Sequence, residues 1–230
     1  PLGCPENRLP PMPSFAKDFS PQELHTDAEI VLALHTLGSF DFSGHILNEF
    51  VRDVAIKYVE SDNPEIRKAS ALTCCQLFVH DPIINQTSSH SIQVVGEVID
   101  KLLTVGVGDP EPEIRRTVLW SLDRKFDRHL AKPENIRCLF LAVNDEVFAV
   151  REAAISIIGR LSSVNPAYVF PPLRKLLVNL LTGLGFASTA RQKEESAQLI
   201  SLFVSNATKL IRSYVDPMVT SLLPKTTDPN

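Results

Sequence analysis

Apolar residues recur along this chain at the spacing of α-helices, and one segment shows the pattern most clearly. Segment 144–161 places Val150, Ala154, Ile158 and Leu161 at steps of four, four and three residues. Because an α-helix makes one turn in about 3.6 residues, this spacing lines up one apolar stripe on one helix face. The same arrangement occurs three more times in the sequence. The pattern therefore predicts an all-α fold built from repeated helices.

A basic residue marks the same place in every copy of the pattern. The four copies align on Arg67, Arg115, Arg151 and Lys193, at intervals of 48, 36 and 42 residues. Modest-sized residues follow early in each helix, which lets a neighbouring helix approach closely. An Asp, a β-branched residue, an Arg and then small residues, at a period of about 40, resemble the HEAT repeat. The predicted fold class is an α-solenoid of antiparallel helix pairs stacked in a superhelix.

Polar turns precede three of the four copies. They are Asp62-Asn63-Pro64, Asp109-Pro110-Glu111-Pro112 and Asn144-Asp145. Asp and Asn cap free backbone N–H groups, and Pro is tolerated in the first helical turn. We expect each Arg to bridge to an Asp of a neighbouring turn, with an anion-binding groove as the alternative. The fourth copy has Gln192 before its basic residue and no preceding Asp, so this bridge is in doubt there. The predicted ladder consists of Asp62, Arg67, Asp109, Arg115, Asp145, Arg151 and Lys193.

The helical periodicity divides the chain into three parts. Residues 1–26 are rich in proline and predict an extended or disordered lead-in. Residues 27–223 predict the repeat array, and 224–230 predict the truncated start of a further repeat. In the last pair, Pro171-Pro172 predict one short turn, a bend and then a helix that ends near Leu181. The predicted pairs are 46–79, 92–127, 133–162 and 168–205, flanked by unpaired helices at 27–38 and 208–223. Unpaired helices at both ends predict a piece of a longer array.

Composition narrows the class of protein further. The chain has 230 residues, 44 % hydrophobic and 22 % charged, with a net charge of −4. This balance supplies a core and disfavours nucleic acid or an anionic membrane as the main partner. No apolar run approaches the roughly 20 residues of a membrane span. Adjacent Cys74 and Cys75 suit buried thiols better than a disulfide framework, so we expect a reducing, cytoplasmic compartment.

Motifs for catalysis are missing from the sequence. There is no phosphate-binding glycine loop, and no pair of histidines has metal-ligand spacing. We therefore predict no catalytic residue, no cofactor and no metal site. Trp120 and Phe148 are candidate anchors for a protein partner, although the pattern favours packing between helix layers as the role of each.

Several short stretches together resemble one family more closely than they resemble HEAT repeats in general. They are 34–42, 121–127, 129–131, 142–148, 159–163, 165–167 and 173–175, within a resemblance that covers roughly residues 30–223. These stretches are similar to the N-terminal HEAT region of the target-of-rapamycin kinases. The resemblance implies a non-catalytic scaffold segment of a serine/threonine kinase whose catalytic domain lies far downstream. It also implies contacts with neighbouring repeats and raptor-type subunits, and a cytoplasmic parent recruited to endomembranes.

Two other interpretations stay open at this point. The segment could belong to another HEAT scaffold, of the nuclear-transport-receptor or phosphatase-scaffold type. It could also be a helical-repeat nucleic-acid enzyme of the DNA-glycosylase type. That class requires a basic concave face, which the net charge of −4 disfavours.

Overall fold

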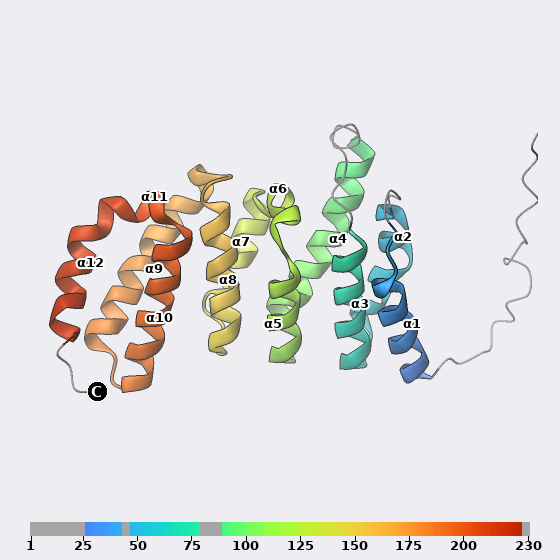
Figure 1. The fold of residues 1–230 in the computed structure, drawn as a ribbon, viewed down its shortest axis with the longest axis horizontal. Helices are drawn as coiled ribbons and strands as arrows, with labels where there is room; N and C mark the ends of the chain where they lie inside the picture. The colour runs from blue at the N-terminus through green and yellow to red at the C-terminus, as the bar shows by residue number, and fades with distance from the viewer. Residues whose placement is uncertain (1–25, 43–46, 79–88, 227–230) are drawn as a thin grey trace, which may run out of the picture.

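The computed structural model describes residues 26–42, 47–78 and 89–226, and in this part of the chain the protein is a row of helices (Figure 1). No strand occurs within these residues. The proline-rich lead-in apart from Thr26, most of the connection at 80–91 and the terminal Asp228 to Asn230 lie outside them. The helices are α1 (Asp27–Ser39), α2 (Asn48–Asp53), α3 (Pro64–Leu77), α4 (Ser89–Gly108), α5 (Pro112–Ser121), α6 (Asp127–Leu130), α7 (Pro133–Ala142), α8 (Phe148–Leu161), α9 (Pro166–Phe186), α10 (Ala190–Asn206), α11 (Thr208–Ile211) and α12 (Val215–Leu222). Short 3-10 segments are η1 (Ala55–Glu60), η3 (Arg124–Phe126), η4 (Arg212–Tyr214) and η5 (Leu223–Lys225).

The helices form two layers, and each contacts its neighbours along the row. One layer runs α1, α3, α5, α8, α10, and the other runs α2, α4, α7, α9. Helices of the two layers alternate along the chain, so consecutive helices pack as antiparallel pairs. Contacts run from each pair to the next, which is the organisation of an α-solenoid. The predicted fold class is confirmed.

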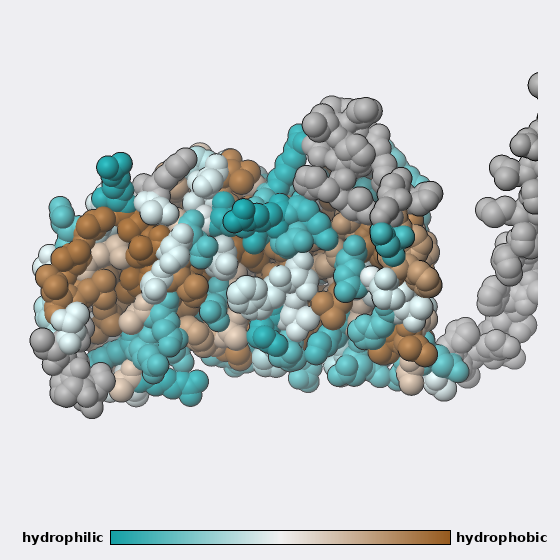
Figure 2. Space-filling view, in the orientation of Figure 1, coloured by the Kyte–Doolittle hydropathy of each residue, from teal (hydrophilic) through white to brown (hydrophobic). Residues whose placement is uncertain are grey.

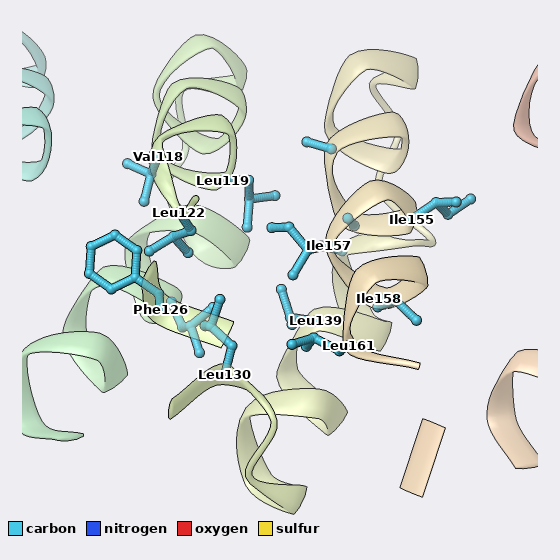
Figure 3. Close-up of a cluster of buried hydrophobic side chains, with 14 of the residues drawn as sticks. Val118, Leu119, Leu122, Phe126, Leu130, Leu139, Ile155, Ile157, Ile158 and Leu161 are labelled. Carbon is cyan, nitrogen blue, oxygen red and sulfur yellow. The ribbon is translucent and has the colours of Figure 1, made fainter. Parts of the chain in front are cut away.

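One continuous apolar core fills the space between the layers, extending from Val51 to Met218. In its middle, Leu119 of α5 points toward Ile157 of α8 (Figure 3). Cys74 and Cys75 are free thiols buried in this core. Burial raises the pKa of the Cys75 thiol to about 12 and that of Cys74 further, so both stay protonated and act as apolar packing groups.

The helix predicted to run to residue 127 ends earlier. Helix α5 stops at Ser121, and η3 and α6 follow as separate short turns. The side chain of Asp123 accepts a hydrogen bond from the backbone N–H of Lys125, which starts a new turn in place of a longer helix. The apolar periodicity continued through this region because Leu122 and Phe126 are buried despite the break.

The first helix of the first pair is also divided. Helix α2 gives way at Val54 to the 3-10 segment η1. Buried Ser70 of α3 donates its hydroxyl to the carbonyl of Ala55 at 2.6 Å. A side chain from the partner helix thus holds a backbone carbonyl at the point where the helix tightens.

In the last pair the structure has one helix where a short turn, a bend and a second helix were predicted. Helix α9 is unbroken through Pro171 and Pro172, and it extends five residues beyond the predicted end at Leu181. The two prolines deprive the carbonyls of Ala167 and Tyr168 of helical partners. Both residues are exposed, so water can bond these carbonyls.

Candidate functional site

Arginine side chains connect successive repeats along one edge of the array, and Arg67 makes the first connection. Its Nε and Nη2 donate to the two carboxylate oxygens of Asp109 at 2.8 and 3.1 Å. Its Nη1 donates to the backbone carbonyls of Ser61 and Asp62, both at 2.9 Å. Asp62, a predicted ladder residue, therefore contributes through its backbone. One guanidinium joins the turn before its own helix to the turn before the next.

Arg115 makes the same connection one repeat further on. Its Nε and Nη2 donate to the carboxylate of Asp145 at 2.8 and 3.0 Å. Its Nη1 donates to the carbonyl of Asp109 at 2.7 Å. The side chains of Arg115 and Asp145 are only 8 % and 9 % exposed. The paired, planar geometry is the one that a guanidinium and a carboxylate adopt when they bond at two points.

The third connection, from Arg151, ends on a residue that the sequence did not indicate. Nη1 of Arg151 donates to the carbonyl of Asp145 at 2.7 Å, as in the two earlier repeats. Its Nη2 donates to Glu195 of α10 at 2.5 Å. The acceptor thus lies within a helix, two residues after Lys193, the predicted ladder position. Glu195 also accepts a hydrogen bond from Arg191 at 3.0 Å, at helical spacing, but this local pair gives no signal for the bond with Arg151.

These connections serve structure, because their polar atoms are used within the protein. Hydrogen bonds that Arg67 and Arg115 donate to Asp109 and Asp145 raise the pKa of the two guanidinium groups, so both stay charged. Each carboxylate also accepts a backbone N–H two residues later, from Glu111 and Val147, at 2.8 Å. We define the ladder as Arg67–Asp109, Arg115–Asp145 and Arg151–Glu195.

A further ion pair lies at the other end of these helices and was not predicted. Nε of Arg160, in the last turn of α8, donates to Asp127 at 2.6 Å. Its Nη2 donates to the carbonyl of Leu122 at 2.8 Å. Burial raises the pKa of Asp127 above its ordinary value, against the opposing effect of Arg160. This pair ties α8 to the turn that follows α5.

The two aromatic candidates differ in their surroundings. The ring of Phe148 packs against the core, with the guanidinium carbon of Arg151 at 5.5 Å from its centroid. It therefore has the packing role. The side chain of Trp120 is 53 % exposed on α5, so packing between layers does not describe it.

Outside the ladder, the described residues hold neither a metal-binding cluster nor a membrane-spanning helix. No group of three or more His, Cys, Asp or Glu side chains there could hold a metal ion. No helix in the described ranges is long and apolar enough to cross a membrane. An open cavity of about 450 Å³ is lined by Ser162, Pro166, Phe170, Asn206 and Thr208, together with Ser163 and Ala207. No titratable side chain is among them.

Comparison with known proteins places the chain in one group of sequences. It is 50 % identical over 220 residues to serine/threonine-protein kinase tor1 of Schizosaccharomyces pombe, a match that covers 94 % of this chain and 9 % of that protein. It is 45 % identical to serine/threonine-protein kinase TOR2 of Saccharomyces cerevisiae, over 88 % of this chain and 8 % of that protein. Among solved structures, a homology model of the full-length AP-3 complex in an intermediate open conformation has a TM-score of 0.45 and 17 % identity, over 87 % of this chain and 38 % of that chain. No family model matches the chain.

The fold and the ladder define an all-α solenoid with no recognised catalytic motif in its sequence. The sequence matches then give the family: the chain is a segment of the target-of-rapamycin family, and it spans 8 % to 9 % of the length of the relatives it matches.

Proposed function

We propose that this chain is a non-catalytic HEAT-repeat scaffold segment of a target-of-rapamycin kinase. The observation that carries the proposal is the ladder, which fixes each helix pair against the next through buried or half-buried ion pairs. A rigid array of this kind presents a long surface and holds distant parts of a large protein at fixed separation. In this proposal the segment supports assembly of the kinase complex in the cytoplasm.

Exposed apolar side chains support contact with neighbouring repeats of the same longer protein. The surface of α12 and the adjoining helices is strongly apolar (Figure 2). Val215, Val219 and Leu223 are 44 %, 45 % and 62 % exposed. A soluble protein rarely leaves such a patch uncovered. We assign this face to the next helices of the array and assign raptor-type subunits to the outer surfaces of the helix layers.

The test uses the full-length kinase, with the ladder broken in this segment. Arg115→Glu places a carboxylate against Asp145, whereas Lys175→Glu makes the same kind of change at an exposed side chain on α9, outside the ladder. We expect Arg115→Glu to reduce recovery of the raptor-type subunit with the kinase, while phosphorylation of a short peptide substrate is retained. Equal recovery with both variants would show that this segment does not support assembly. Loss of peptide phosphorylation with Arg115→Glu alone would show a direct role in catalysis.

A binding experiment separates docking from architecture. The isolated chain is immobilised and incubated with the purified raptor-type subunit, and retention is compared with that on an unrelated helical repeat protein. Selective retention supports a docking surface in this segment. No retention, with a normal helical circular dichroism spectrum, would restrict the role to architecture.

A further inference from the structure

The exposed Trp120 has no counterpart in the other repeats. It is the only tryptophan of the chain. It lies five residues after the ladder arginine of its helix, where the other copies have Leu72, Ser156 and Gln198. On α5 it shares one face with Glu113 and Arg116, at helical spacing. A large indole left 53 % exposed on an otherwise polar helix face is unusual for a residue with only a packing role.

Two cations reach neighbouring elements at the turn that follows Trp120. Lys125, five residues after Trp120 and beyond the end of α5, donates to the carbonyl of Cys75 on α3 at 2.6 Å. Arg160 reaches from α8 to the carbonyl of Leu122 at 2.8 Å, two residues after the indole. These hydrogen bonds hold one cation toward each neighbouring helix. The segment that follows Trp120 is therefore framed by positive charge on both sides.

Positive charge exceeds negative charge around this point, although the whole chain is acidic. Arg124 and Arg128 are exposed on the turns that follow α5, and Figure 2 shows hydrophilic surface over α6. Five cations and three carboxylates lie here, and Arg116, Lys125 and Arg160 are each ion-paired with one of those carboxylates. The local excess is therefore two positive charges, on a chain of net charge −4. The cations are Arg116, Arg124, Lys125, Arg128 and Arg160, and the carboxylates are Glu113, Asp123 and Asp127. We call Trp120 and these five cations the Trp120 surface.

We propose that the Trp120 surface docks an acidic protein segment that carries an aromatic or aliphatic anchor residue. Tryptophan and arginine are enriched among the residues that dominate protein–protein binding energy. A cationic rim attracts an acidic partner and orients it. Interspersed carboxylates disfavour a phosphate backbone, and one exposed indole gives too little apolar area for a membrane. This inference rests on the proposed scaffold function, because it names the kind of partner that one face of the scaffold takes.

The single tryptophan makes the surface directly observable by fluorescence in the 230-residue chain. We expect the emission maximum of a solvent-exposed indole, and stronger quenching by iodide than by caesium, because the surrounding cations concentrate the anion. Reversing two charges with Arg124→Glu and Arg128→Glu should remove this preference. Equal quenching by both ions, or stronger quenching by caesium, would overturn the charge assignment.

Binding is tested with synthetic peptides of about 15 residues. One carries a central Leu-Trp pair among Glu and Asp, a second replaces the acidic residues by Lys, and a third replaces the Leu-Trp pair by Ser. We expect only the first peptide to bind. A version of this peptide with Phe in place of its Trp should shift the fluorescence of Trp120 to the blue, because Trp120 is then the only tryptophan in the sample. Trp120→Ala should weaken this binding by about tenfold or more, measured by anisotropy of a labelled peptide. Tyr168→Ala, at a residue 50 % exposed on α9, is the matched control and should bind normally.

The remaining outcomes are also decisive. No binding of the acidic anchored peptide, or equal loss with Trp120→Ala and Tyr168→Ala, would overturn the proposal. Stronger binding to duplex DNA or to phosphatidylserine vesicles than to the peptide would assign the surface to that partner instead. If the peptide does not bind but the raptor-type subunit is still retained by Trp120→Ala, the scaffold function stands and this inference fails alone. Failure of both binding and ladder-dependent assembly would reject the scaffold function itself.

Discussion

Two aspartates combine a local and a long-range role at the residue scale. Asp109 and Asp145 each accept a backbone N–H two residues ahead and also bind the arginine of the preceding repeat. Sequence could indicate the residue types because turn-forming Asp and repeating Arg are local signals. It could not identify Glu195, because no spacing rule links it to Arg151, which lies 44 residues away. Long-range partners depend on how the helices stack.

Removing the central arginine should destabilise the array strongly. Arg115→Ala leaves Asp145, 9 % exposed, without its main partner. We expect a loss of roughly 3–5 kcal/mol in the free energy of unfolding, the usual cost of breaking a buried ion pair from one side. Urea denaturation followed by circular dichroism measures this. Arg116→Ala, at an arginine 43 % exposed, is the control and should change little. Equal effects of the two changes would contradict a structural role for the ladder.

Glu195 should make stability depend on acid pH. Arg191 first, and then Arg151, hold the pKa of Glu195 below its ordinary value of 4.5. The unfolded chain therefore binds this proton more tightly, so the stabilisation is complete above 4.5 and is lost as pH falls through the lower folded value. We expect Glu195→Gln to lower the melting temperature at pH 7 and to flatten its decline below about pH 4.5. The assignment would be contradicted if the melting temperature of Glu195→Gln declined as steeply with acid as that of the unchanged protein. It would also be contradicted if Glu194→Gln flattened the decline to the same extent.

At the scale of the element, periodicity located the helices better than it located their ends. Helix α3, for example, starts directly after a turn signal that is visible in the sequence, Asn63 followed by Pro64. The interruptions at Val54 and Leu122 were missed, because buried apolar residues continue across them and because contacts from other side chains hold the turns. The prediction of a short turn separate from the helix at Pro171 failed for a related reason: exposed carbonyls let one helix run through both prolines.

Close packing of two elements depends on one glycine. A Cβ atom at Gly159 of α8 would lie 2.4 Å from Cβ of Asn206, at the end of α10, and 3.3 Å from its backbone carbon. Gly159→Ala should therefore force these helices apart and lower the free energy of unfolding by about 1–3 kcal/mol. Gly185→Ala on α9 meets nothing within 4 Å and should raise stability by up to about 1 kcal/mol. Comparison of the two denaturation midpoints tests this, and a stabilising Gly159→Ala would disprove the close approach.

At the scale of the whole molecule, the sequence predicted the solenoid because its repeats share one spacing of apolar and basic residues. It could not predict which outer surface carries function, since exposure of a residue such as Trp120 depends on the neighbouring helices. Contacts between helices run from each pair to the next within the described residues. Stability should therefore be approximately a sum over neighbouring repeats.

Local disturbance should stay local in such an array. We expect Gly159→Ala to speed amide hydrogen exchange in α8 and α10 while α3 keeps its protection, because α3 does not pack on α8. Mass spectrometry of peptic fragments resolves these helices. Uniform acceleration across the chain would show that the array unfolds as one cooperative unit.

The three ladder connections are not equal, and this difference has a mechanical consequence. Arg67 and Arg115 each hold the next repeat at two carboxylate oxygens, whereas Arg151 holds Glu195 by one hydrogen bond. A pulling force along the row would load these connections in series. We expect extension to begin at the Arg151–Glu195 junction, so that α10 and the helices beyond it swing relative to a stiffer N-terminal part. The segment would then transmit tension unevenly, as a stiff rod with one compliant joint.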